Sequence, residues 1–594
     1  MRLAVSALVF AVGAGSASAQ WQAGFDTSRL GLTSRAVEVD SQGDIWALET
    51  MVVTASQPGF RVARFSPTGL ESWTSPITTL SQVDSYYAFS SGGVGPFATV
   101  AYRNFDTSGV MRVDAAGSIV WHNNAWGITG FQPKYLVDEI PVGASGECYV
   151  TCAAYTSAAT GYDFAVLSFD ALGALRWTRF VDGGASGALD YPRDIALDGF
   201  GGLYVCGTWN ETLTTGGTFA LTRLDVAGNV LWSRSFAGAG GGGVANAVAV
   251  DAAGNAYVAG VSTSGTEALL VKWDTAGNLV WSRAHSIGIG ALYNDVAVDA
   301  AGTSFATGTQ YVGTLPFPSS ADVLTDARAA NGDLLWHDVW NWAPTGAEAG
   351  QQISLDAGGR ATVVGSNSST LGSVTLVGRF ERDGTPRWTT SFNPGEVNLP
   401  LDSDAGLTGN VVLGLYGYSN STGVEGHLVE VRDQSNAFCF GDASSLACPC
   451  GNNSVVGAAT GCLNASGSGA RLTDSGVASV SADSLALEGV GMPPGTICLF
   501  VQGGSSSAPV VFGDGLRCAS GALKRLYVSA APTGSVEVPG LFGTSVSVRS
   551  AAEGDVLAAG STRSYQIFYR DADATFCTSN TFNMSSGLSI AWAP

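Results

Sequence analysis

Residues 246–283 read NAVAVDAAGNAYVAGVSTSGTEALLVKWDTAGNLVWSR, and this stretch decides the fold of most of the chain. It contains four short apolar runs, at Ala247–Val250, Ala256–Ala259, Ala268–Trp273 and Leu279–Trp281. Runs this short, rich in Val and aromatic residues and separated by Gly, Asp and Asn, are typical of β-strands. The stretch therefore predicts a four-stranded antiparallel meander.

Two tight turns connect these predicted strands. One runs from Asp251 to Gly254 and the other from Asp274 to Gly277. An Asp side chain can accept hydrogen bonds from the backbone of its own turn, and Gly supplies the positive φ that a tight hairpin needs. We assign the same turn-capping role, and no metal, to the other strand-ending aspartates, Asp40, Asp198, Asp299 and Asp356.

The same unit recurs along most of the chain. A D-x-x-G-x-x-x-W pattern, or a close variant, ends each unit, and successive tryptophans lie 48 to 56 residues apart. These tryptophans are Trp73, Trp121, Trp177, Trp232, Trp281, Trp336 and Trp388. A period of about 50 residues with four strands per unit is the signature of a β-propeller, whose blades are four-stranded sheets.

An eighth unit begins near Leu399 and supplies three strands without a terminal Trp. The missing strand is predicted at the other end of the chain, at Trp21–Phe25. Pairing the first strand with the last unit would leave no exposed sheet edge. We therefore expect an all-β fold in which residues 20–434 form an eight-bladed β-propeller closed by the N-terminal strand. Seven blades are the alternative, if the degenerate second unit around Tyr86 is not a blade.

Two known repeats share these motifs. The segment Asp251–Gly260 resembles the D-x-x-G-N-x-Y-V-x-G core of the β-propeller repeat found in secreted bacterial proteins, and Asp198–Gly207 resembles it in part. The D-x-x-G-x-x-x-W ending resembles the tryptophan-docking repeat of quinoprotein dehydrogenases, which are eight-bladed. That second resemblance implies a quinone cofactor stacked on a vicinal disulfide, but this chain has no Cys-Cys pair. We therefore expect no cofactor.

The composition limits which classes of partner and which cellular compartment we expect. The formal net charge is -21 and only 13% of the 594 residues are charged. A nucleic acid or an anionic membrane surface requires a basic face, so neither is expected as a partner. Residues 1–19 have the basic start, the apolar stretch and the Ala17-Ser-Ala19 site of a secretory signal peptide. The mature chain is expected to be secreted, extracellular or at the cell surface, to have no membrane span, and to be monomeric.

A second domain is predicted over residues 437–594, where the repeat pattern ends. Short β-rich runs between Gly and Ser turns favour a small β-sandwich. The stretch resembles a Cys-rich module at the C-terminal ends of secreted repeat proteins of bacteria, for which no activity is known. Disulfide bonds are preferred over a zinc site in an exported protein. The candidates for these bonds are Cys439, Cys448, Cys450, Cys462, Cys518 and Cys577.

Four further cysteines remain. Cys498 is the extra cysteine of the C-terminal stretch, because the others lie in the motifs of the resembling module. Cys148, Cys152 and Cys206 lie near equivalent positions of neighbouring units, and the sequence leaves open a bridge from Cys206 to Cys148 or to Cys152. Connectivity cannot be deduced from the sequence.

No catalytic motif appears. The chain has no G-x-S-x-G elbow and no H-x-x-x-H pair, so it offers neither a serine nucleophile nor a histidine metal site. Aromatic residues beside Asn and Glu at the ends of second strands could stack a sugar ring and bind its hydroxyls. The candidate ligand-binding residues are Tyr155, Trp209, Asn210, Glu211, Tyr311, Tyr416 and Tyr418.

The sequence thus favours a secreted, non-enzymatic binding or structural protein that recognises extracellular glycan or protein. The alternative is an extracellular propeller enzyme acting on polysaccharide, with paired carboxylates that only the fold can bring together. Whether the chain catalyses a reaction stays open at this point.

Overall fold

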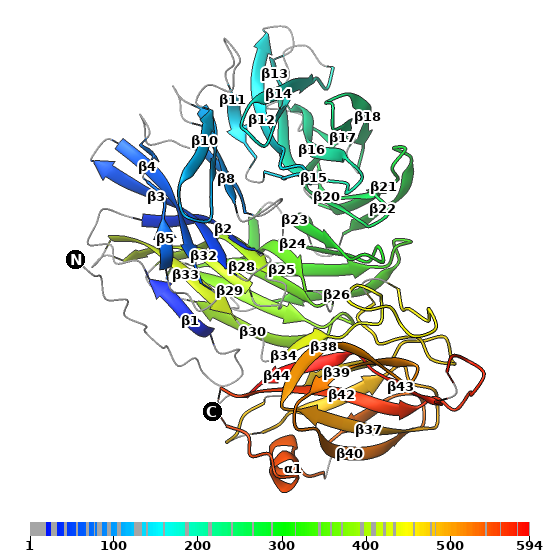
Figure 1. Ribbon diagram of the computed structural model, residues 1–594. Coiled ribbons are helices and arrows are strands. Elements are labelled where there is room, and N and C mark those ends of the chain that lie inside the picture. Colours follow the sequence, from blue (N-terminus) through cyan, green and yellow to red (C-terminus); the bar gives the residue numbers. More distant parts are fainter. Residues whose placement is uncertain are drawn as a thin grey trace. The chain divides into compact units, whose positions relative to one another are not determined.

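The computed structural model describes residues 19–592 with short gaps (Figure 1). The residues outside the description are 1–18, 25–31, 41–43, 55–56, 67–70, 77, 80–85, 92–96, 104–107, 124–132, 138–139, 158–160, 185–188, 212–216, 239–240, 264–265, 287–288, 315–316, 342–345, 357–358, 370–371, 393–396, 406–410, 420–422, 432–434, 456–457, 476–477, 482, 541–542, 559, 579 and 593–594. The predicted signal peptide therefore lies almost wholly outside it.

The chain divides into two compact parts. The repeat region contains residues 1–355 and 361–431, and the C-terminal module contains residues 356–360 and 432–594. The end of the repeat pattern predicts this change of domain between residues 434 and 437. Within the described residues, the chain has no helix long and apolar enough to span a membrane.

The first four units of the repeat region are antiparallel groups of strands, and a parallel bridge between Tyr162 and Leu189 joins the third and fourth into one sheet. The first contains β2 (Leu32–Val39), β3 (Ile45–Thr54), β4 (Gln57–Phe65), β5 (Glu71–Thr74) and the short β6 (Thr78–Thr79). The second contains β7 (Tyr86–Ser91), β8 (Ala98–Arg103), β9 (Ser108–Val113) and β10 (Ile119–Asn123). The third contains β11 (Pro133–Leu136), β12 (Cys148–Ser157), β13 (Gly161–Phe169) and β14 (Leu175–Val181). The fourth contains β15 (Leu189–Leu197), β16 (Gly202–Glu211), β17 (Thr218–Asp225) and β18 (Val230–Phe236).

The remaining units follow the same order. The fifth contains β19 (Gly243–Val250), β20 (Ala256–Ser262), β21 (Ala268–Trp273) and β22 (Leu279–His285). The sixth contains β23 (Gly290–Val298), β24 (Ser304–Thr314), β25 (Phe317–Arg328) and β26 (Leu334–Trp340). The seventh contains β27 (Ala347–Leu355), β28 (Ala361–Ser369), β29 (Gly372–Phe380) and β30 (Pro386–Phe392). The second unit, degenerate in sequence, thus has four strands, as the other units do apart from the first with its additional short β6.

The last unit is built from both ends of the repeat region. It contains β31 (Val397–Ala405), β32 (Val411–Ser419) and β33 (Gly423–Val431), and its fourth strand is β1 (Ala19–Gly24). β1 pairs with β33 in antiparallel register, with Trp21 opposite Glu430. The predicted pairing of the N-terminal strand with the three-stranded unit is therefore present.

Aspartate turns connect the strands as the sequence predicts. Asp251 Oδ1 accepts hydrogen bonds from the backbone N–H groups of Ala253 and Asn255 at 3.0 and 2.9 Å. Gly254 has a φ of +81° in this turn. The same carboxylate bond to the residue four positions on is made by Asp40, Asp198, Asp299 and Asp356. These carboxylates cap turns, and the repeated Asp needs no metal to explain it.

Six of the seven motif tryptophans join their unit to the next, and the side chain of the seventh, Trp388, lies outside the described residues. Trp232 Nε1 donates a hydrogen bond to the carbonyl of Thr275, in the last turn of the following unit, at 3.0 Å. Its indole lies so close to Gly277 that a Cβ there would be 2.7 Å from the ring, and Gly277 has a φ of +80°. The same tryptophan-to-carbonyl bond connects Trp73 to Ala115, Trp121 to Ala171, Trp177 to Val226, Trp281 to Ala330 and Trp336 to Arg382. The Trp of one motif therefore packs against the Gly of the next motif, and this contact joins neighbouring units.

The C-terminal module has two sheets, a hairpin and one helix. A six-stranded sheet contains β34 (Ser435–Phe438), β44 (Gly587–Ala591), β42 (Thr562–Arg570), β43 (Phe582–Met584), β37 (Thr496–Gly503) and β40 (Lys524–Ala531). A three-stranded sheet contains β35 (Arg471–Ser475), β36 (Ala486–Val490) and β41 (Val536–Val538), and β38 (Ser505–Phe512) pairs with β39 (Gly515–Ser520). The helix is α1 (Val546–Ala552). Both sheets contribute to one apolar core, for example through Leu487 and Ile567.

All six predicted disulfide cysteines are paired in this module. The bonds are Cys439–Cys518, Cys448–Cys462 and Cys450–Cys577. Cys498, predicted as the extra cysteine, is a buried thiol. A module of this size gains stability from such bonds mainly because they restrict the unfolded chain.

The bridge that the sequence left open in the repeat region is absent from the described structure. Cys148, Cys152 and Cys206 are buried, and none of them belongs to one of the three disulfides. The reason is their side-chain direction. Cys148 and Cys152 pack with residues of the second and third units, whereas Cys206 packs with residues of the fourth and fifth.

Candidate functional site

β-Bulges in the first strands of several units turn one extra residue toward a common cavity. The pairing of β19 with β20 shifts between Ala245 and Ala247, which leaves Asn246 as the extra residue. A bulge re-aims a side chain in this way. The equivalent residues are Arg35, Arg193, Asn294 and Gln351. All five line the cavity.

Aspartates next to these bulges bind the backbone of the following unit. Asp194 Oδ2 accepts from Val248 N, and Asp295 Oδ2 accepts from Ile353 N, both at 2.7 Å. We call these residues, with Asp402, the inter-unit aspartates. They join the fourth unit to the fifth and the sixth to the seventh.

Asp402 makes the same bond between the last unit and the first. Its Oδ2 accepts from Val37 N at 2.9 Å, and Asp404 Oδ2 accepts from Val39 N at 2.7 Å. The hydrogen bond that connects successive units elsewhere therefore also connects β31 with β2.

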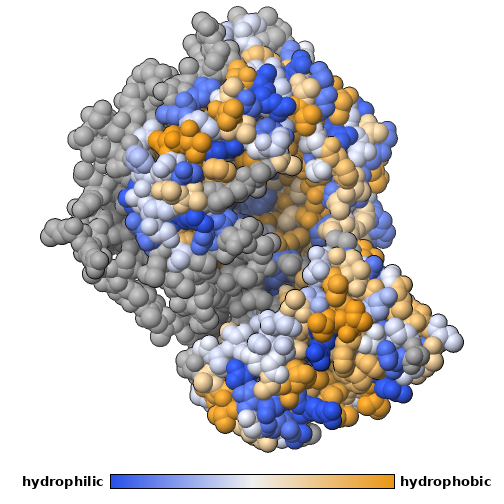
Figure 2. All heavy atoms as spheres, in the orientation of Figure 1, coloured by the Kyte–Doolittle hydropathy of each residue, from blue (hydrophilic) through white to orange (hydrophobic). Residues whose placement is uncertain are grey.

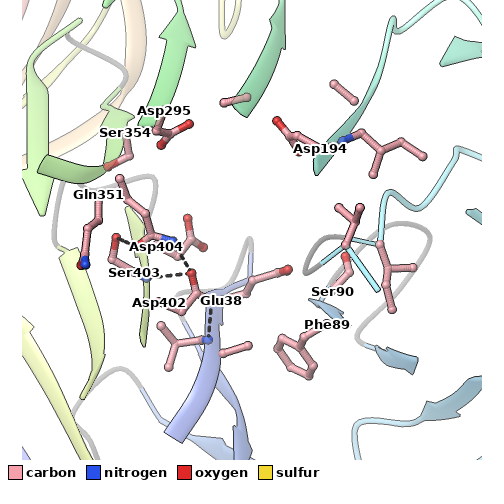
Figure 3. A pocket seen from close by; sticks show the side chains of 18 of the residues that line it. Glu38, Phe89, Ser90, Asp194, Asp295, Gln351, Ser354, Asp402, Ser403 and Asp404 are labelled. Carbon is pink, nitrogen blue, oxygen red and sulfur yellow. Dashed lines mark hydrogen bonds between the residues drawn. The ribbon is translucent and has the colours of Figure 1, made fainter. Parts of the chain in front are cut away.

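The cavity has a volume of about 910 Å³ and is lined by residues from all eight units of the repeat region. Figure 2 shows a hollow in the face of the repeat region, with both polar and apolar atoms visible in it. One wall is polar and comes from the seventh, the last and the first units. Its residues are Arg35, Glu38, Gln351, Gln352, Ser354, Asp402, Ser403 and Asp404. Figure 3 shows Asp402, Ser403 and Asp404 grouped on this side, and the Glu38 side chain extending into the open space.

The other wall combines apolar residues with Ser90, Arg193 and Asp194. Its apolar residues are Phe89, Val137, Ile140, Pro141, Ala196 and Leu197. Cavities that combine apolar walls with a few placed polar groups are typical of small-molecule sites. The arrangement can therefore hold a ligand with one polar edge and one apolar face.

Burial shifts the pKa values of two carboxyl groups at this cavity. Burial raises the pKa of Asp402 to about 7, although Gln352, Val37 and Ser403 donate hydrogen bonds that lower it. Burial raises the pKa of Asp295 to about 6 against the bonds from Ile353 and Val296. Perturbed carboxyl groups cluster at functional sites, although structural networks also produce them.

A group of three carboxylates lies away from the cavity. Among the residues that the structure describes, Asp163, Asp182 and Asp190 alone bring three potential metal-ligating groups within 4.8 Å of one another. Burial, and then the charges of Asp163 and Asp182, raise the pKa of Asp190. Carboxylate oxygens at this spacing are the ligands that a hard cation such as Ca²⁺ uses. Asp163 and Asp190 belong to different strands and Asp182 follows a third, so no spacing in the sequence could have pointed to them.

The ligand-binding residues predicted from the sequence are not brought together at the cavity. Trp209 is buried, with 8% of its surface exposed, and packs against Phe164. Asn210 supports the carboxylate group, because its backbone N–H donates to Asp190 Oδ1 at 2.7 Å. Tyr155 is 42% exposed and meets Tyr162 edge to face. The indole of Trp209 packs in the core because β16 extends to Glu211, and a role of this residue in ligand binding stays a prediction.

The remaining predicted residues stay predictions. Glu211 and Tyr311 are partly buried at the ends of second strands. Tyr416 and Tyr418 belong to β32, but their side chains lie outside the described atoms. None of the described members of the predicted set lines the cavity. The cavity residues were missed because bulges, which turn them inward, leave no distinct residue pattern.

Comparison with known proteins supports the repeat. Residues 183–211, which span β15 and β16, match the model of the beta-propeller repeat, SBBP. The chain contains a β-propeller repeat. No curated protein matches the chain significantly.

Solved structures with a similar arrangement of strands are distant from this propeller-repeat protein. Sqt1 from Chaetomium thermophilum has 11% identity and a TM-score of 0.42, over 69% of this chain and 100% of that chain. The polysaccharide lyase Uly1 has 10% identity and a TM-score of 0.40, over 68% of this chain and 90% of that chain. Virginiamycin B lyase from Staphylococcus aureus has 11% identity and a TM-score of 0.27, over 48% of this chain and 94% of that chain. At these values the likenesses support no statement about activity.

Proposed function

We propose that this protein is an exported binding protein whose eight four-stranded units close into a β-propeller, and that the central cavity binds a saccharide. Three disulfides in the C-terminal module fit an oxidising compartment, as expected for an exported chain. The module is interpreted as a β-sandwich that serves as an accessory to the propeller.

Ring closure is supported by two contacts between the ends of the repeat region. β1 completes the sheet of β31 to β33, and Asp402 binds Val37 with the bond that Asp194 and Asp295 make elsewhere. A closed ring also accounts for a cavity to which all eight units contribute lining residues. Seven blades would leave one of the four-stranded units without a place.

The two-walled cavity is the observation that carries the saccharide proposal. A sugar presents hydroxyl groups at its edge and C–H groups on its face. The amide of Gln351, the hydroxyl of Ser354 and the carboxylate of Glu38 suit the hydroxyl groups, while Phe89 and Ile140 suit the C–H face. A cavity of about 910 Å³ lies within the range of small-molecule sites.

A second candidate, polysaccharide cleavage, is favoured by one observation. Asp402 and Asp404 are two residues apart on β31, and the pKa of Asp402 is about 7. Two neighbouring carboxyl groups, one of them with a raised pKa, are the arrangement that glycosidases use. Against this role, both oxygens of Asp402 accept N–H groups, from Val37, Gln352 and Ser403, which is the behaviour of a structural acceptor.

The test is binding of a panel of oligosaccharides to the full mature chain by isothermal titration calorimetry. Ser354→Trp should fill the cavity and abolish binding, whereas Leu279→Trp, at a position 51% exposed on an outer strand, should leave it unchanged. Product analysis of the same mixtures by mass spectrometry separates the two candidates. Shortened saccharides in the wild-type mixture, and their absence from the mixture with Asp402→Asn, would favour the enzyme. Binding that survives Ser354→Trp, or no binding by any saccharide, would overturn the proposed site.

A further inference from the structure

Two of the four histidines of the chain meet between the fifth and the sixth units. His285 ends β22, the fourth strand of the fifth unit, and His337 lies in β26, the fourth strand of the sixth. Their ring centres are 5.8 Å apart, and the two ring planes are inclined by 49°. Neither residue lines the central cavity, so this pair is independent of the proposed saccharide site.

A carboxylate of the neighbouring unit orients the His285 ring. His285 Nδ1 lies 3.1 Å from Oδ2 of the buried Asp326, in β25. The same oxygen accepts hydrogen bonds from the Tyr293 hydroxyl group and, at 3.2 Å, from the Arg328 guanidinium group. A carboxylate oxygen only accepts, so Nδ1 donates the hydrogen, and in the neutral ring Nε2 then carries a lone pair. A histidine that binds a metal ion is usually held by a carboxylate in this way.

The other ring nitrogen of His285 has no partner among the described residues. Nε2 is buried, forms no hydrogen bond with any of them, and belongs to a side chain that is 4% exposed. A buried polar atom without a partner is unfavourable, because it has lost its bonds to water. The lone pair of Nε2 is therefore the group of this cluster that a ligand would satisfy.

His337 supplies a second imidazole on the same side of the sixth unit. In the pairing of β25 with β26, Asp326 is directly opposite His337, so the two side chains project from one face of the sheet. His285 contacts both of them on that face. His337 is exposed, so solvent reaches this pair. Two imidazoles that share a metal ion at metal–nitrogen distances of about 2.0–2.1 Å have ring centres roughly 4.5–6.5 Å apart, a range that includes the observed spacing.

We infer that His285, through Nε2, and His337 together bind a divalent transition-metal ion such as Zn²⁺, Ni²⁺ or Cu²⁺, with water in the remaining positions. Imidazole nitrogen suits these ions, whereas Ca²⁺ and Mg²⁺ prefer oxygen ligands. The site thus differs in ligand class from the three carboxylates of the third and fourth units. The bound ion would join the fifth unit to the sixth. No H-x-x-x-H spacing marks it, because the two histidines come from different units.

The experiment titrates the full mature chain, without a histidine tag, with Zn²⁺ and Ni²⁺ by calorimetry and with Cu²⁺ by electron paramagnetic resonance. We expect one ion per chain, a higher unfolding temperature, and a Cu²⁺ spectrum with coupling to two imidazole nitrogens. Mutation of a mere orienting partner weakens metal binding about 10–100-fold, so loss of a ligand in His337→Ala should weaken it at least about tenfold. His122→Ala is the matched control, because His122 also directly follows a motif tryptophan but has its Nε2 2.7 Å from the Tyr102 hydroxyl oxygen. It should bind the ion as the wild type does.

The exposed position of His337 keeps the test decisive, because His337→Ala should fold even if the buried His285→Ala does not. Unchanged affinity in His337→Ala would overturn the inference, and so would failure of all three ions to bind. Displacement of bound Zn²⁺ by Ca²⁺ would overturn it as well, since it would indicate oxygen ligands. A loss of affinity in His122→Ala equal to that in His337→Ala would show that exposed histidines bind the ion without a built site, and would also overturn the inference.

Discussion

Alanine at Gly277 tests the contact between the glycine turn of one unit and the tryptophan of the preceding unit. Gly277 has a φ of +80°, and a Cβ at this position would be 2.7 Å from the Trp232 ring. Gly277→Ala should therefore lower the free energy of unfolding in two ways. A non-Gly residue in the left-handed region costs about 1–2 kcal/mol, and forcing an extra methyl group into a packed site costs about 1–3 kcal/mol. The expected loss in the free energy of unfolding is roughly 2–5 kcal/mol.

Gly199 is the matched control. It has a φ of +70°, but a Cβ there would have nothing within 4 Å, so Gly199→Ala should lose only the conformational part, about 1–2 kcal/mol. Urea unfolding followed by tryptophan fluorescence compares the two. In Trp232→Ala the ring is gone, so adding Gly277→Ala should then cost no more than Gly199→Ala, a coupling that a double-mutant cycle measures. Equal effects of Gly277→Ala and Gly199→Ala in the wild-type background would refute the reasoning.

Two further predictions concern a disulfide and a buried carboxyl. Replacing the Cys450–Cys577 pair by Ser should destabilise the module about 2 kcal/mol more than replacing Cys448–Cys462, because the first spans 127 residues and the second 14. Calorimetric unfolding checks this, and equal losses would contradict the loop argument. Burial raises the pKa of Glu49 to about 7, so the folded chain holds a proton that the unfolded chain releases near pH 4.5. The free energy of unfolding should therefore fall by up to about 3 kcal/mol as the pH rises from 4.5 to 7, and Glu49→Gln should flatten this slope. An unchanged slope in urea titrations across that range would show that another group is responsible.

The repeat could be predicted from the sequence because its information is local. The turn Asp, the Gly with positive φ and the Trp of each motif lie within about ten residues, and each has a structural role of its own. The fourth strand of the last unit could be predicted as well. Trp21 had no unit of its own, and β33 had no outer neighbour other than β1.

The site could not be predicted for a physical reason. In a regular strand alternate residues share a face, and a bulge shifts this alternation by one residue without any required residue type. Asn246 therefore faces the cavity although no pattern marks it. The burial of Trp209 could not be read from the sequence either, because β16 continues past the end that the apolar run indicates. The cysteines of the C-terminal module were identified by their motifs, but which cysteine meets which depends on the tertiary fold.

The pairing of β1 with β33 also determines when the repeat region can finish folding during synthesis. β1 ends at Gly24, and its partner strand ends at Val431. At about 5–20 residues per second, a ribosome needs roughly 20–80 s to produce the residues between them. Until β33 has been synthesised, β1 has no partner strand, and its edge could pair with other chains. Completion of the repeat region is thus an event late in synthesis, and a chain truncated before Gly423 would carry β1 without its partner.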